Sequence, residues 1–70
     1  MMYRVRITME WRNEAADPTT FIQGVAAVST KHALKKALAM AEQSPEWHSR
    51  VVLRGWPEPR LSVDISEPTP

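Results

Sequence analysis

The chain has 70 residues, including nine lysines and arginines, eight aspartates and glutamates and no cysteine, and its formal net charge is +1. A chain of this length forms one domain with a small core, and the absence of cysteine excludes disulfide bonds as its support. The nearly balanced charge excludes the strongly basic composition of many nucleic-acid binders, and no stretch reaches the ~20 apolar residues of a membrane span.

The first predicted element covers residues 3–12, YRVRITMEWR, where apolar and polar side chains alternate without a break. A period of two with β-branched and aromatic members predicts a strand with one buried face. Asparagine, aspartate, proline and threonine residues then predict a loop, and residues 21–29 predict a second strand. Apolar residues lie on both sides of this second strand, so its facing stays open, and Gly24 is a candidate for a β-bulge that exchanges the two sides.

Residues 29–43 predict the single long helix. Ser29 suits the N-cap position because its hydroxyl can accept a hydrogen bond from a free backbone N–H of the first turn. Pro45 predicts that the helix ends at Ser44, since a residue before proline avoids helical geometry. The apolar face of this helix is spaced to pack on a sheet and consists of Ala33, Leu34, Ala37, Leu38 and Ala41.

Residues 50–56, RVVLRGW, and 60–65, RLSVDI, predict a third and a fourth strand, separated by a Pro-Glu-Pro bend. The order of elements predicts one α+β domain over residues 1–66, in which a single helix covers one face of a four-stranded antiparallel ββαββ sheet. Residues 67–70 are expected to form a disordered tail. The expected core consists of Tyr3, Val5, Ile7, Met9, Trp11, Leu34, Ala37, Leu38, Val51, Leu53, Leu61, Val63 and Ile65.

The other face of the predicted sheet has no helix to cover it, and the period of two places most of its charged residues there. These are Arg4, Arg6, Arg12, Arg50, Arg54 and Arg60, with Glu10 and Asp64 as the acidic residues. One interpretation is that this is the solvated side of the sheet, where arginines pair with acids across strands. A second is that the guanidinium groups bind the carboxylates or phosphates of a partner.

The favoured hypothesis is a non-catalytic cytoplasmic binding protein whose partner is an acidic protein or a second copy of the chain in a homodimer. The expected binding residues are Arg4, Arg6, Arg54 and Arg60, with Trp56 as an interface anchor. The alternative is a nucleic-acid-binding protein in which the same arginines contact phosphates, without outward aromatic residues that stack on bases. The N-terminus lacks the pattern of a signal peptide, which agrees with a cytoplasmic protein that has no membrane partner.

The sequence shows no catalytic or metal-binding pattern. Its two glycines belong to no phosphate-binding motif, and without cysteine there is no thiol nucleophile. His32 and His48 have neither the partners of a Ser-His-Asp triad nor the spacing of a zinc site. We therefore predict no enzyme activity, no bound metal and no cofactor.

The stretch from Val25 to Glu42, VAAVSTKHALKKALAMAE, resembles a pattern common in small uncharacterised phage-encoded and bacterial proteins. In that pattern a strand runs into a serine or aspartate cap, and a helix with Ala-Leu pairs four residues apart follows. Here it is carried by Ser29, Ala33, Leu34, Ala37 and Leu38. The preference for arginine over lysine and the many alanines also resemble proteins of GC-rich actinobacteria and their phages. The resemblance implies a phage-encoded protein that binds a host protein, and it assigns no site residue.

Overall fold

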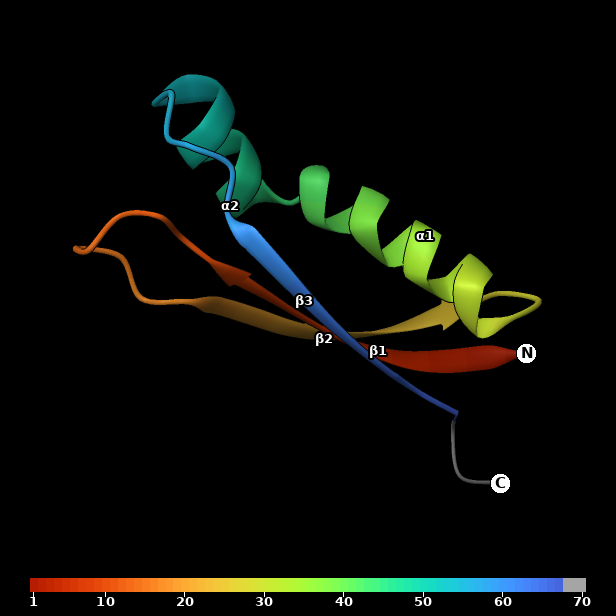
Figure 1. Ribbon diagram of the computed structural model, residues 1–70. Coiled ribbons are helices and arrows are strands. Elements are labelled where there is room, and N and C mark those ends of the chain that lie inside the picture. Colours follow the sequence, from red (N-terminus) through yellow and green to blue (C-terminus); the bar gives the residue numbers. More distant parts are fainter. Residues whose placement is uncertain (68–70) are drawn as a thin grey trace.

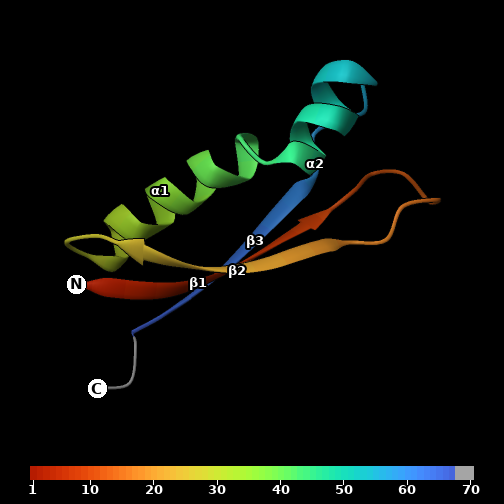
Figure 2. The same ribbon diagram turned by 180° about the vertical axis from the view of Figure 1, so that it is seen from behind.

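In the computed structural model, which describes residues 1–67, two strands are followed along the chain by a long helix, two shorter helical segments and a third strand, arranged in two layers (Figure 1). The elements are β1 (Met2–Glu10), β2 (Thr19–Ala26), α1 (Thr30–Glu42), α2 (Pro45–Trp47), the π-helix η1 (His48–Leu53) and β3 (Arg60–Ser66). The strand order is β2-β1-β3, and both neighbouring pairs are antiparallel. Figures 1 and 2 show α1 crossing one face of the sheet, while no helix or strand of residues 1–67 lies on the other face.

The prediction of a four-stranded ββαββ sheet is wrong, although the α+β class holds. The predicted strand over residues 50–56 does not form, because the chain is already helical when it reaches them. The Ser44 side chain accepts a hydrogen bond from the Trp47 N–H, and Pro45 occupies the first turn, so α2 begins there and continues into η1. The helical segment ends at Gly55, whose φ of +73° favours glycine, and the Trp56 N–H donates to the Arg50 carbonyl at 2.8 Å.

The alternation in β1 is confirmed, and it builds most of the core. All the odd-numbered side chains from Tyr3 to Trp11 lie on the helix side of the sheet, and none is more than 8% exposed. Met9 and Trp11 pack against Trp47, whereas Tyr3, Val5 and Ile7 pack beneath α1. Opposite them, three helix alanines one turn apart are completely buried: Ala33, Ala37 and Ala41. Their small side chains let the helix backbone approach the sheet closely over Tyr3, Val5 and Ile7.

Some residues expected in the core are outside it. Leu34 and Leu38 remain 39% and 37% exposed, and Leu53 is 71% exposed at the end of η1. The reason is the missing strand, because a sheet of three strands is too narrow to cover both sides of the helix's apolar stripe. Val51, Leu61, Val63 and Ile65 are half-buried and pack against the core from its margins.

The facing of β2, which the sequence left open, is settled by its register. The pairing with β1 is continuous from Met2↔Ala26 to Met9↔Thr19, so no bulge interrupts it at Gly24. Phe21 pairs with Ile7 and faces the helix, and Ile22 therefore points to the uncovered face. The expected tail over residues 67–70 falls outside the described residues except for Glu67, which is exposed.

Candidate binding surface

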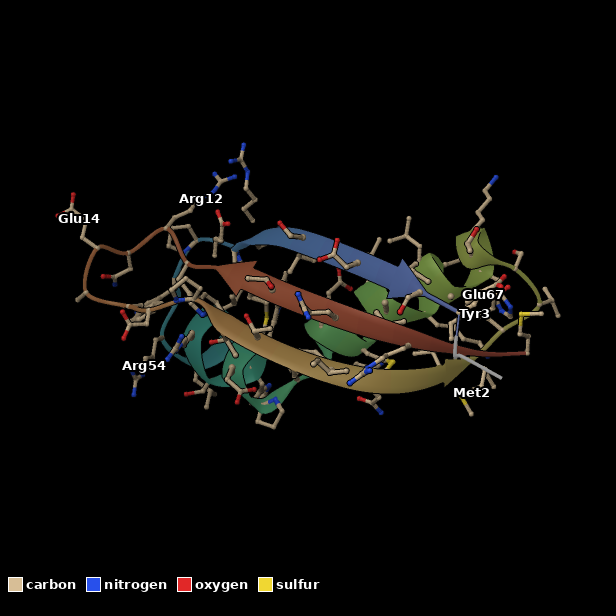
Figure 3. All side chains as sticks on the ribbon, turned by 90° about the horizontal axis from the view of Figure 1, so that it is seen from below. Met2, Tyr3, Arg12, Glu14, Arg54 and Glu67 are labelled. Carbon is tan, nitrogen blue, oxygen red and sulfur yellow. The ribbon has the colours of Figure 1, made fainter. Side chains whose placement is uncertain are left out.

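Within residues 1–67, the side of the sheet turned away from α1 is uncovered, and we call it the open face. Figure 3 looks directly at it, with the helices behind the strands. Its residues are Met2, Arg4, Arg6, Thr8 and Glu10 of β1, Thr20, Ile22, Gly24 and Ala26 of β2, and Arg60, Ser62, Asp64 and Ser66 of β3. The sheet register therefore places three guanidinium groups and two carboxylates on one surface.

Two of these arginines have a carboxylate directly across the strand. Arg6 lies opposite Asp64, and Arg60 lies opposite Glu10. Opposite charges at such positions stabilise a sheet by about 0.2–1 kcal/mol per pair. For Arg6 and Arg60, the interpretation as the solvated side of a sheet accounts for the charge without any partner.

Arg4 is different because its cross-strand neighbours are Gly24 and Ser66, and neither carries a charge. The side chain is exposed, and Gly24 beside it carries no side chain, so that the exposed Met2 side chain lies next to it. Here the open face has a hollow of about 320 Å³, lined by Arg4, Arg6, Ile22, Asp64 and Ser66. Arg4 is thus the open-face cation with the least local compensation.

Exposed apolar side chains lie close to these arginines. Ile22 is 51% exposed and contributes to the hollow, and Met2 at the start of β1 is 53% exposed. No aromatic side chain occupies the open face in the described chain, since Tyr3, Trp11 and Phe21 all belong to the helix side. The combination on this face is therefore guanidinium, hydroxyl and aliphatic groups.

The six arginines expected on one face are in fact divided between the two sides of the molecule. Arg4, Arg6 and Arg60 lie on the open face, but Arg50 and Arg54 belong to η1 and its C-terminal end. Figure 3 shows Arg12 and Arg54 on opposite sides of the loop end of the sheet. The expected grouping of Arg54 with the sheet arginines is wrong, because it depended on a strand that does not form.

Trp56 also differs from its expected role as an exposed anchor. It is half-buried, and its ring lies 6.0 Å from that of Trp11, at an interplanar angle of 78°. The Arg50 guanidinium stacks on both, 4.8 Å from the centre of the Trp11 ring and 5.4 Å from that of Trp56. Together with buried Met9 and Trp47, these side chains form a second small core at the loop end of the sheet. The sequence carries no local signal for this cluster, which joins residues far apart in the chain.

The lysines form a separate basic surface on α1. Lys31, Lys35 and Lys36 are exposed on the helix layer, and Lys36 Nζ donates to the Ala26 carbonyl at the edge of β2. Because the sheet lies between these lysines and the open face, the two basic surfaces do not join into one groove.

His32 takes part in the hydrogen bonds at the start of α1, whereas His48 is exposed. His32 Nδ1 accepts a hydrogen bond from the Val28 N–H, and the His32 N–H donates to Ser29 Oγ, both at 3.2 Å. The predicted N-cap at Ser29 is thereby confirmed. Within residues 1–67, no three His, Cys, Asp or Glu residues are grouped so that they could hold a metal ion, and no helix is both long and apolar enough to cross a membrane.

The surface with the most residues available to a partner is therefore the open face, and Arg4 is its least compensated charge. Its features have to be interpreted from their own chemistry. No protein family, curated protein or solved structure was found to match the chain.

Proposed function

We propose that this protein is a non-catalytic binding module whose open face binds an acidic segment of another protein. The observation that supports the proposal most directly is the position of Arg4. Its side chain is exposed, the residues directly opposite it are uncharged, and it lines a hollow with Arg6, Ile22, Asp64 and Ser66. A guanidinium binds a carboxylate through two parallel hydrogen bonds, and a neighbouring apolar side chain adds contact area that excludes water.

An acidic protein suits this surface better than a nucleic acid. Half-exposed Met2 and Ile22 offer apolar contact that a phosphate backbone does not use. Readers of single-stranded nucleic acid on open sheets stack bases on aromatic side chains, and the aromatic residues here face the helix. The carboxylates of Glu10 and Asp64 would also repel phosphates, whereas a protein partner can place its own cations beside them.

The proposal is tested by selecting binding peptides from a random display library with the wild-type protein as bait. We expect the selected peptides to combine aspartate or glutamate with an aliphatic residue. The Arg4→Gln variant should bind them about tenfold more weakly, which is the size of effect for a residue at the centre of an interface. Lys35→Gln removes the same charge from α1 and should bind as wild type does. Peptides without acidic residues, or equal binding by Arg4→Gln, would contradict the proposal.

Nucleic acid is the alternative that a salt series distinguishes. Affinity for single-stranded DNA or duplex RNA that depends on phosphate contacts falls with salt by about 0.7–0.9 in log-log slope per contact. If such binding is found, and Arg4→Gln reduces both the affinity and the slope while acidic peptides fail to bind, the open face is a nucleic-acid surface and the proposal is wrong.

A further inference from the structure

β3 is an edge strand within residues 1–67, since it pairs with β1 on one side and with no strand on the other. The Ala27 N–H donates to the Met1 carbonyl at 2.9 Å, which shows that odd-numbered residues of β1 direct their backbone groups toward β2. Its even-numbered residues therefore face β3. Through the register, the free edge of β3 presents the N–H and C=O groups of Leu61, Val63 and Ile65.

The two edges of the sheet are not equivalent. At the outer edge of β2, the outward-facing carbonyl of Ala26 already accepts a hydrogen bond from Lys36. A lysine at an edge opposes the addition of another strand, because strand pairing would bury its charge. β3 contains no lysine. Of the two edges, that of β3 is therefore the one open to a further strand.

Apolar surface accompanies the edge of β3. Met40 lines a hollow with residues of β2, so the opposite flank of α1, which carries Leu34 and Leu38, is turned toward β3. These two leucines are 39% and 37% exposed. Figure 3 shows the first turns of α1 outside the line of β3. Below this overhang the helix-facing side chains of β3 are only half-buried.

The sequence of β3 identifies a partner strand with the right chemistry. Residues 60–64, Arg-Leu-Ser-Val-Asp, place opposite charges at the two ends, an apolar residue next to each, and Ser62 at the centre. When two such strands pair antiparallel around a two-fold axis at Ser62, Arg60 of each lies directly across from Asp64 of the other. Leu61 of each lies across from the partner's Val63, with their outward backbone groups in position to exchange hydrogen bonds.

We propose that β3 pairs in this way with β3 of a second copy, which joins two sheets into one of six strands. The overhanging leucines of each α1 then cover the helix side of the partner's β3. A second copy is favoured over an unrelated strand because the charge pattern of this strand is complementary to itself. The pairing uses the sheet edge and needs no acidic partner, so it stands or fails separately from the proposed function.

The experiment compares Arg60→Asp, Asp64→Arg and an equimolar mixture of the two by analytical ultracentrifugation. In either variant alone, positions 60 and 64 carry the same charge, and position 60 of each chain would lie across from position 64 of the other. The dimer would therefore contain two pairs of like charges, which should weaken self-association at least about tenfold. In the mixture, each aspartate meets an arginine again, so heterodimers should form. The intrachain repulsion that each variant introduces, against Glu10 or Arg6, is unchanged by mixing. Restored dimerisation can therefore come only from contacts between chains.

We expect wild type to sediment at twice the chain mass of 8.0 kDa, each variant as a monomer at the same concentration, and the mixture as a dimer. Arg4→Asp is the matched control, because it makes the same charge change on the central strand and should remain dimeric. A monomeric wild type, a dimer that neither variant weakens, or a mixture that stays monomeric would overturn the proposal.

A second measurement does not depend on charge. The chain has no cysteine, so Ser62→Cys introduces a single thiol at the proposed axis. Cα atoms that face each other across an antiparallel pair without direct hydrogen bonds lie about 4.5 Å apart, within the range that a disulfide spans. Ser62→Cys should form a covalent dimer under mild oxidation, and Ser66→Cys on the same strand should not. Equal cross-linking of the two variants would refute the pairing around Ser62.

Discussion

At the scale of single residues, Arg50 has the most constrained environment among the arginines. Its guanidinium lies 4.8 Å and 5.4 Å from the ring centres of Trp11 and Trp56, and its buried Nη1 has no hydrogen-bond partner in the described chain. Guanidinium groups stack well on aromatic rings because their charge is delocalised and weakly hydrated. Such contacts contribute about 0.5–1 kcal/mol when exposed and about 2 kcal/mol when desolvated. Arg50 therefore helps to attach η1 to the end of β1.

This contact leads to a prediction about stability. Arg50→Ala should lower the free energy of unfolding by about 1–2 kcal/mol, because it removes both the cation–π contacts and the packing of the aliphatic stem. Arg54→Ala is the matched control, since its exposed guanidinium lies 6.0 Å from Trp56 alone, and it should cost less than about 0.5 kcal/mol. Urea denaturation measures both, and equal losses would show that the stacking on Trp11 contributes nothing.

The two glycines should respond in opposite directions to alanine. Gly24 has no positive φ, and an added Cβ would lie 3.3 Å from Met2 Sδ, the end of a flexible and exposed side chain. Gly24→Ala should therefore raise the free energy of unfolding by about 0.4–1 kcal/mol, because alanine lowers the conformational entropy of the unfolded chain. Gly55 has a φ of +73°, and Gly55→Ala should lower stability by about 1 kcal/mol or more. Thermal denaturation of the two variants checks the signs, and a destabilised Gly24→Ala would contradict the description of β2.

At the scale of elements, the alanine face of α1 determines how closely the helix lies to the sheet. Ala37 is completely buried, and Ala39 is exposed on the opposite side of the same helix. Ala37→Leu should destabilise the protein by about 1–3 kcal/mol, because the added methyl groups force the layers apart. Ala39→Leu adds the same group in solvent and should stay within about 0.5 kcal/mol of wild type. Unfolding measured by circular dichroism separates them, and equal stabilities would mean that the helix does not pack as described.

The sequence could predict some of these elements and not others. β1 and β3 alternate over enough residues that the period of two identifies both the strand and its buried side. The apolar run at residues 51–53 is too short to show a period, so it does not distinguish a strand from a helix. A new helix starts at Ser44 and Pro45 and continues into η1, which places residues 51–53 in a helical segment. Arg4, Arg6 and Arg60 could therefore be placed on the open face from the sequence, and Arg54 and Trp56 could not.

At the scale of the whole molecule, the protein is elongated, since its sheet has three strands instead of the expected four. The extents are 40 × 18 × 16 Å, and the radius of gyration of 12.9 Å exceeds the about 11 Å expected for a globular chain of this length. An elongated domain buries less of its apolar surface, which leaves the flank of α1 beside β3 exposed. The shape thus separates two surfaces, a sheet face that bears arginines and an apolar edge, and each is assigned a different partner.

We propose that the open face binds acidic protein segments, and NMR can map such binding onto individual backbone amides. The ligand is a synthetic peptide of alternating glutamate and leucine, titrated into ¹⁵N-labelled protein at moderate salt. We expect the largest chemical-shift changes around Arg4, Arg6 and Ile22, and we expect Arg4→Gln to reduce them. Changes centred on Lys31 and Lys35 of α1, or no saturable change anywhere, would contradict the assignment of the open face as the binding surface.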